Sequence, residues 1–168
     1  MMAQKADEFR DYVFARQDRL LRTAWLLTGN WASAEDLVQT SLVKVWRRWA
    51  SLGIDDPDAY VNRVMINTYA TWWRRKWRGE LPSARLPDMP DSSDAEAAVD
   101  DRDRLRRLLA GLPRGERIAL VLRYYEGLSE ADTATVMGCS IGSVKSQASR
   151  GAARLRLQQS AREVTEED

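Results

Sequence analysis

The polar residues with the clearest chemical use lie near the C-terminus, on a predicted helix that begins at Ser140. At about 100° per residue, its apolar positions fall together on one side. These inward positions are Val144, Ala148, Ala152 and Leu155. The outward side and its edges carry hydroxyls, an amide and cations: Ser143, Lys145, Ser146, Gln147, Ser149 and Arg150. Such side chains allow a helix to enter a DNA major groove, hydrogen-bond base edges and hold phosphates.

A helix-turn-helix is the element expected to position this polar face. Ala134 lets two helices approach closely, and Gly138 follows where the tight turn favours a positive φ. Met137 and Cys139 flank that glycine as apolar packing residues. An ordinary helical hairpin with a solvated polar face is the alternative. Spacing and surface chemistry together favour DNA binding.

The remaining chain also predicts helices. Apolar residues recur at three- and four-residue steps over residues 9–27, 34–50 and 58–77, with Ser33 as a candidate cap of the second helix. Periodicity resumes at Asp101, and further helices are expected over 113–125, 129–137 and 140–158. No long stretch alternates with period two. We therefore expect an all-α protein of two small domains, a three-helix domain and a helix-turn-helix domain.

Charge divides the chain in the same way. Residues 1–79 carry 13 basic and 9 acidic residues, whereas residues 80–101 carry 1 basic and 7 acidic ones, with prolines and serines among them. Residues 102–157 are basic again, and the tail to residue 168 is acidic. The predicted domains are thus 1–79 and 102–168, joined by a flexible acidic linker over 80–101. Two basic bodies suggest a polyanionic partner.

Several classes of function are excluded by composition. Cys139 is the only cysteine and histidine is absent, so the chain has no internal disulfide, no usual zinc site and no histidine catalysis. The carboxylates of Asp55, Asp56 and Asp58 lack a partner base and are explained by helix capping. We therefore expect no catalytic residue, no metal, no cofactor and no enzymatic activity. The N-terminus lacks an apolar signal core and no apolar run could cross a bilayer, so a cytoplasmic protein without membrane insertion is expected.

Taken in order, the motifs resemble the sigma-70 family of transcription initiation factors, in particular the extracytoplasmic-function type that has only regions 2 and 4. Residues 34–39 (Ala-Glu-Asp-Leu-Val-Gln) and 43–47 (Val-Lys-Val-Trp-Arg) resemble the region 2 helix that docks on polymerase. Residues 59–68 resemble the helix that closes a pocket for a flipped −10 base. Leu112-Pro113 with Arg117, residues 127–129, and the helix-turn-helix resemble region 4. Thr40, Thr133 and Gly151 depart from the family's usual residues.

The resemblance implies core RNA polymerase and promoter DNA as partners, with an anti-sigma protein as a further candidate. It assigns polymerase binding to Asp36, Gln39 and Lys44. It assigns the −10 element to Asn62, Arg63, Asn67, Trp72, Arg74 and Arg75. It assigns the −35 element to Ser143, Lys145, Ser146, Gln147, Ser149 and Arg150. The acidic linker would thread the basic channel of polymerase, although solubility explains its sign equally well.

Two alternatives stay open beside this reading. Residues 68–73 (Thr-Tyr-Ala-Thr-Trp-Trp) are identical to a stretch that primary sigma factors use at the upstream edge of the bubble. The position of Asn67 and the following Arg74 and Arg75 favour the other register, in which Trp72 and Trp73 pack and contact backbone. A conventional helix-turn-helix regulator would use only the second domain, and binding to core polymerase separates it from a sigma factor.

Overall fold

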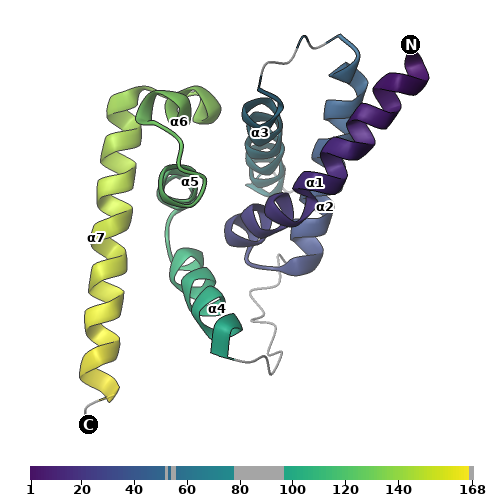
Figure 1. Cartoon of the computed structure of the whole chain (residues 1–168). Coiled ribbons are helices and arrows are strands. Elements are labelled where there is room, and N and C mark those ends of the chain that lie inside the picture. Colours follow the sequence, from purple (N-terminus) through teal and green to yellow (C-terminus); the bar gives the residue numbers. More distant parts are fainter. Residues whose placement is uncertain (52, 54–55, 78–96, 167–168) are drawn as a thin grey trace. The chain divides into compact units, whose positions relative to one another are not determined.

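The computed structural model describes residues 1–51, 53, 56–77 and 97–166, and all regular structure in these ranges is helical (Figure 1). The chain divides into two compact units, Met1–Asp88 and Met89–Asp168. The expected linker falls largely on residues outside the described ranges. Within the described ranges, no helix is both long and apolar enough to span a membrane.

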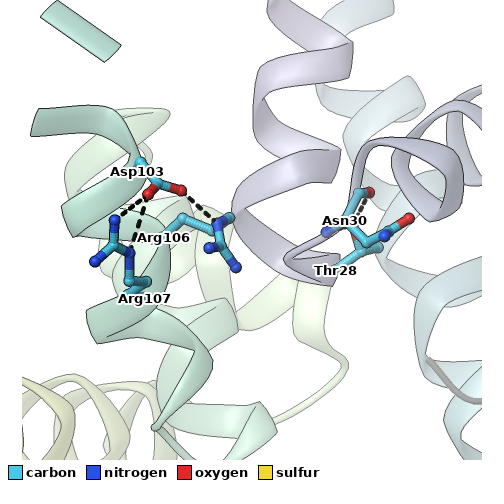
Figure 2. A network of polar contacts seen from close by, with 5 residues as sticks. All are labelled: Thr28, Asn30, Asp103, Arg106 and Arg107. Atoms are coloured by element: carbon cyan, nitrogen blue, oxygen red, sulfur yellow. Dashed lines mark hydrogen bonds and ion pairs between the residues drawn. The ribbon is translucent and has the colours of Figure 1, made fainter. Parts of the chain in front are cut away.

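The first unit contains α1 (Met2–Thr28), α2 (Trp31–Trp49) and α3 (Pro57–Trp77). Gly29 ends α1 in the left-handed region, at φ 75°, with its N–H donating to the Trp25 carbonyl. The side chain of Asn30 then caps α2 by accepting from the Ser33 backbone N–H at 3.0 Å. The predicted Ser33 cap is therefore wrong, and α2 begins at Trp31. Figure 2 shows Thr28 and Asn30 bonded together in this turn.

The core of the first unit forms where the apolar sides of the three helices meet. Tyr69 of α3 is almost fully buried, and its hydroxyl donates to the Leu27 carbonyl of α1 at 2.8 Å. This bond satisfies a polar group inside the core and ties α3 to the end of α1. The other fully buried side chains include Leu37, Val45, Val61 and Met65.

The second unit contains α4 (Ala97–Ala110), α5 (Arg114–Leu120), a π-helical turn η1 (Val121–Tyr125), α6 (Glu130–Met137) and α7 (Ile141–Glu166). Two predicted boundaries were wrong, and one predicted helix has a different geometry in its second half. The helix expected from Asp101 begins at Ala97, and the helix expected over 113–125 changes to π geometry at Val121. The last helix runs beyond the expected end at Gln158 to Glu166, and residues 159–166 include an alanine, a glutamine, an arginine and two glutamates, which favour helix.

Buried polar contacts hold α4 and α5 together. The Arg117 side chain is nearly buried, and it donates from Nε to the Leu109 carbonyl at 3.0 Å and from Nη2 to the Leu112 carbonyl at 3.1 Å. These carbonyls lie at and just after the end of α4, where backbone carbonyls have no N–H of the same helix to accept from. The Arg117 of the sequence motif is therefore a structural residue.

Within α4, Asp103 forms ion pairs with Arg106, at 3.1 Å, and with Arg107 (Figure 2). Burial raises the pKa of the Asp103 carboxyl, but the hydrogen bonds from Arg107 and Arg106 outweigh it and hold that pKa below its usual range. The negative charge is therefore retained, and it supports the helix through pairs three and four residues apart.

Gly151 explains how closely α5 and α7 pack. A Cβ at this position would lie 2.9 Å from Leu120 Cδ1 and 3.2 Å from Glu116 Cβ. The glycine that departs from the family's usual alanine therefore permits an approach that a methyl group would oppose. Across this contact, Arg154 Nε lies 3.0 Å from the buried Glu116 carboxylate.

Candidate nucleic-acid interfaces

A basic groove of about 360 Å³ lies between α2 and α3 in the first unit. It is lined by three cations of α2 and by polar and apolar residues of α3, and the described part of its lining contains no carboxylate. Lys44 Nζ donates to Thr68 Oγ1 at 3.0 Å and so spans the groove. Among the described residues, the lining is Lys44, Arg47, Arg48, Tyr60, Val64, Asn67, Thr68 and Thr71.

Of the six residues predicted to contact the −10 element, Asn67 lines this groove with an exposed side chain, and Arg63 and Arg75 lie on the exposed side of α3. Asn62 is different, because it lies on the core side of the helix and is only 6% exposed. Asn62 therefore has little surface to offer DNA, and its assignment is corrected to a core position.

Trp72 is half-buried at the edge of the core, which fits packing more than insertion between bases. The side chains of Trp73 and Arg74, with the loop residues Leu52, Ile54 and Asp55, lie outside the described residues.

The residues predicted to bind polymerase do not form one surface. Asp36 and Gln39 are exposed and continue along α2 into the exposed Val43 and Trp46, at steps of three, four and three residues. Lys44 points to the other side of α2, where it shares the basic groove with Asn67. Its position therefore groups Lys44 with the −10 candidates.

An apolar groove lies beside the exposed row on α2 formed by Asp36, Gln39, Val43 and Trp46. It has a volume of about 620 Å³ between α1 and α2, and Phe14 on its α1 side is 88% exposed. Phe9 supports its floor, with ring centroids 5.1 Å from both Trp46 and Trp49. Sequence periodicity alone did not reveal this groove, although exposed aromatics on two neighbouring helices were a usable signal.

The helix-turn-helix in the second unit has the expected turn. Gly138 has φ 68° between α6 and α7, which confirms the prediction of a positive φ. Ser129 caps α6 by accepting from the Asp132 N–H, and Ser140 caps α7 by accepting from the Ser143 N–H at 3.1 Å. Val144 is fully buried at the base of α7 and fixes the direction of its outward face.

The predicted recognition residues fall into an exposed set and a half-buried set. Lys145, Ser146, Ser149 and Arg150 are exposed on α7. Arg150 Nε donates to the Ser146 carbonyl at 3.3 Å, and Lys145 Nζ lies 3.5 Å from Glu130 Oε2 of α6. Ser143 and Gln147 are half-buried and bonded to each other, from Gln147 Nε2 to Ser143 Oγ at 2.9 Å.

No catalytic arrangement emerges within the described residues. They contain no group of three or more acidic or cysteine side chains placed to hold a metal ion. Tyr12 donates to Asp58 at 2.8 Å, and burial followed by this carboxylate raises the pKa of the Tyr12 phenol. The hydroxyl therefore stays protonated and serves to join α1 to α3, with Arg16 pairing the same carboxylate at 3.1 Å.

Comparison with known families covers both units. The family described as Sigma-70 region 2 matches residues 13–79, and the family described as Sigma-70, region 4 matches residues 102–155.

Individual relatives agree over nearly the whole chain. An RNA polymerase sigma-E factor of Streptomyces avermitilis is 43% identical over 162 residues, covering 94% of this chain and 88% of the relative. The sigma-E factor of Streptomyces coelicolor is 42% identical over 160 residues, covering 94% and 89%. A solved structure of the sigma factor RpoE from Bartonella quintana, in complex with the anti-sigma factor NepR, matches with a TM-score of 0.70 at 26% identity, covering 89% of this chain and 94% of that one.

Proposed function

We propose how the two units of this chain, which belongs to the extracytoplasmic-function type of the sigma-70 family, divide the work of promoter recognition. The chain is a transcription initiation factor that directs RNA polymerase to promoters. In our proposal the first unit binds core polymerase and captures the opened −10 element, and the second reads the −35 element as duplex. The protein would act in the cytoplasm on polymerase and DNA and perform no covalent chemistry itself.

The basic groove between α2 and α3 is the observation that carries this assignment. Its cations, Lys44, Arg47 and Arg48, can hold the phosphates of a displaced single strand. Asn67 offers a donor and an acceptor to the edge of an unpaired base in the same groove. Capturing a base in this way offsets an unpairing cost of a few kcal/mol. The groove thus couples strand binding to strand opening.

The second unit supplies duplex recognition. The hydroxyls of Ser146 and Ser149 can reach base edges, while Lys145 and Arg150 flank them with positive charge. Gly138 ends α6 and Ser140 caps the start of α7, so the recognition residues lie in the first turns of a helix, which suits entry into the major groove.

Polymerase binding is assigned to the row on α2 formed by Asp36, Gln39, Val43 and Trp46. The polar pair at the start of this row gives directional contacts, and the exposed apolar pair gives buried area once covered. The row consists of other residues than the groove's Lys44, Arg47 and Arg48, although Arg47 lies about 40° from Val43 around α2 and so borders the row.

Holoenzyme reconstitution tests the division of labour. Replacing Lys44, Arg47 and Arg48 with alanine should leave core binding intact and reduce open-complex formation on a cognate promoter, read by permanganate reactivity of the bubble. Arg19→Ala, at an exposed arginine on α1, is a control that removes a positive charge outside the groove. Equal bubble reactivity in the triple variant and in Arg19→Ala would remove the groove from the proposal.

A second candidate role concerns the apolar groove between α1 and α2. Phe14, Val43 and Trp46 are exposed there, and a lone protein rarely leaves so many large apolar side chains open together. We propose that an anti-sigma protein covers this groove with an amphipathic helix, because the Bartonella quintana relative is seen with an anti-sigma factor. Phe14→Asp should abolish binding of a co-expressed anti-sigma protein, with Ala15→Asp, at an exposed α1 position that does not line the groove, as the control. Unchanged binding of Phe14→Asp would refute this role.

A further inference from the structure

Gly115 and Gln147 form a contact between α5 and α7 that the recognition scheme above does not use. A Cβ at position 115 would overlap the Gln147 amide oxygen and lie 3.0 Å from its Cδ. The amide of Gln147 therefore occupies the space that the missing side chain of Gly115 leaves. Its Nε2 also donates to Ser143 Oγ at 2.9 Å, so one end of the amide is hydrogen-bonded and the other lies against Gly115.

This contact sets Gln147 apart from the rest of the outward face of α7. Ser146 and Arg150 beside it are exposed, whereas Gln147 is half-buried against α5. In this position its amide is turned toward its own unit, and the lone pair of Ser143 that it uses is not available to a base. If the Gln147 side chain did not pack against α5, its amide could instead form two hydrogen bonds with an adenine, at N6 and N7.

From this geometry we infer that Gly115, which lies outside the helix-turn-helix, is a specificity-determining residue for the −35 element and acts through Gln147. Because residue 115 has only a hydrogen in place of a side chain, the Gln147 amide can pack against α5. A methyl group there turns the flexible side chain away from α5, toward the surface that Ser143 and Ser146 share. The inference rests on the proposed reading of duplex DNA by α7.

The chain contains a matched control for this pair. Gly111 also lies beneath a glutamine of α7, because a Cβ at 111 would be 3.1 Å from Gln158 Nε2. Gln158 is far along α7 from the predicted recognition residues. Neither glycine has a positive φ, so alanine is compatible with the backbone at both positions.

The test is selection of −35 sequences from a randomised pool by holoenzyme made with Gly115→Ala, Gln147→Ala, the double variant or Gly111→Ala. Gly115→Ala should change the preference at one or two neighbouring base pairs by about tenfold, the discrimination typical of one amide–base pair. The double variant should match Gln147→Ala, and Gly111→Ala should match the original chain.

Two results would overturn the inference: an unchanged preference in Gly115→Ala, or an equal change whether or not Gln147 is present. If Ser146→Ala and Arg150→Ala also leave the preference unchanged, the assignment of α7 itself has failed, and the inference fails with it. Nuclear magnetic resonance of the free chain gives a readout without DNA. In Gly115→Ala the Gln147 side-chain amide signals should move toward those of exposed glutamines, and signals that stay in place would contradict displacement.

Discussion

Lys145 of α7 is paired with Glu130 of α6, with 3.5 Å between Nζ and Oε2, across the two helices of the helix-turn-helix. Both side chains are substantially exposed, at 63% and 38%, so the pair contributes little to folding. The pair matters for DNA binding, because a DNA phosphate must compete with the Glu130 carboxylate for the Lys145 ammonium group. Glu130 was not among the residues that sequence reasoning assigned to binding.

We therefore predict that Glu130→Gln strengthens promoter binding. Breaking an exposed pair of up to about 1 kcal/mol corresponds to an increase of at most about fivefold in affinity. Holoenzyme binding to a promoter fragment at low salt measures it. On a Lys145→Ala background the gain should disappear, and a gain that persists there would show that Glu130 acts by general repulsion.

Lys145 and Ser146 are expected to make different kinds of contact. Lys145→Ala should weaken binding to all sequences alike and reduce the salt slope by about one, as loss of a phosphate contact does. Ser146→Ala should change which −35 sequence is preferred, by on the order of 1–3 kcal/mol at one position. Selection on randomised −35 sequences at two salt concentrations separates the two. If Ser146→Ala keeps the −35 preference of the original chain, Ser146 does not belong to the face of α7 that contacts bases.

Asn67→Ala should reduce open-complex formation more than binding to closed duplex. Its amide lines the basic groove and can pair with an unstacked base, whereas duplex binding relies on other residues. Permanganate footprints of the bubble, compared with duplex binding of the same variant, measure the difference. Equal footprints in variant and original chain would assign Asn67 a purely structural role.

The double substitution Asp36→Ala with Gln39→Ala should weaken binding to core polymerase and leave helicity intact. Both side chains are exposed on α2 and neither contributes to the core, so their loss removes partner contacts without unfolding. A core-binding titration with circular dichroism of the free variant tests this. Asp18→Ala, an exposed carboxylate on α1, is the control, and an affinity equal to that control would remove the docking assignment.

Thr133→Val should stabilise the protein. Thr133 is fully buried in α6, and its hydroxyl has no hydrogen-bond partner among the described residues. Replacing that hydroxyl with a methyl group removes the cost of burying an unpaired polar atom, on the order of 1 kcal/mol. Thermal unfolding should shift upward by about 2–8 °C for the second unit. A lower midpoint would mean that the hydroxyl is satisfied in solution.

Local patterns in the chain were enough to predict the classes of element and the order of motifs. Helical periodicity located all three helices of the first unit, because apolar residues at 3.6-residue spacing fall on one side only when the segment is helical. The positive φ of Gly138 was also predictable, since a tight turn between two helices favours a residue without a side chain. The two motifs in order led to the family that the comparisons then showed.

Helix ends were less predictable because several residues compete to cap the same turn. Asn30 and Ser33 are both good N-cap residues, and only the path of the chain after Gly29 decided for Asn30. At the C-terminus, favourable helix formers carried α7 to Glu166 with no core contact to mark its end.

What the sequence by itself determined was which residues share a face of one helix, and hence the outward row on α7 and the exposed pair on α2. Only the tertiary structure decided which helix each face meets. It buried Asn62, brought Lys44 next to Thr68 and turned Gln147 onto Gly115. The reason is physical: periodicity is a property of one segment, whereas burial and pairing depend on neighbours that are distant in sequence.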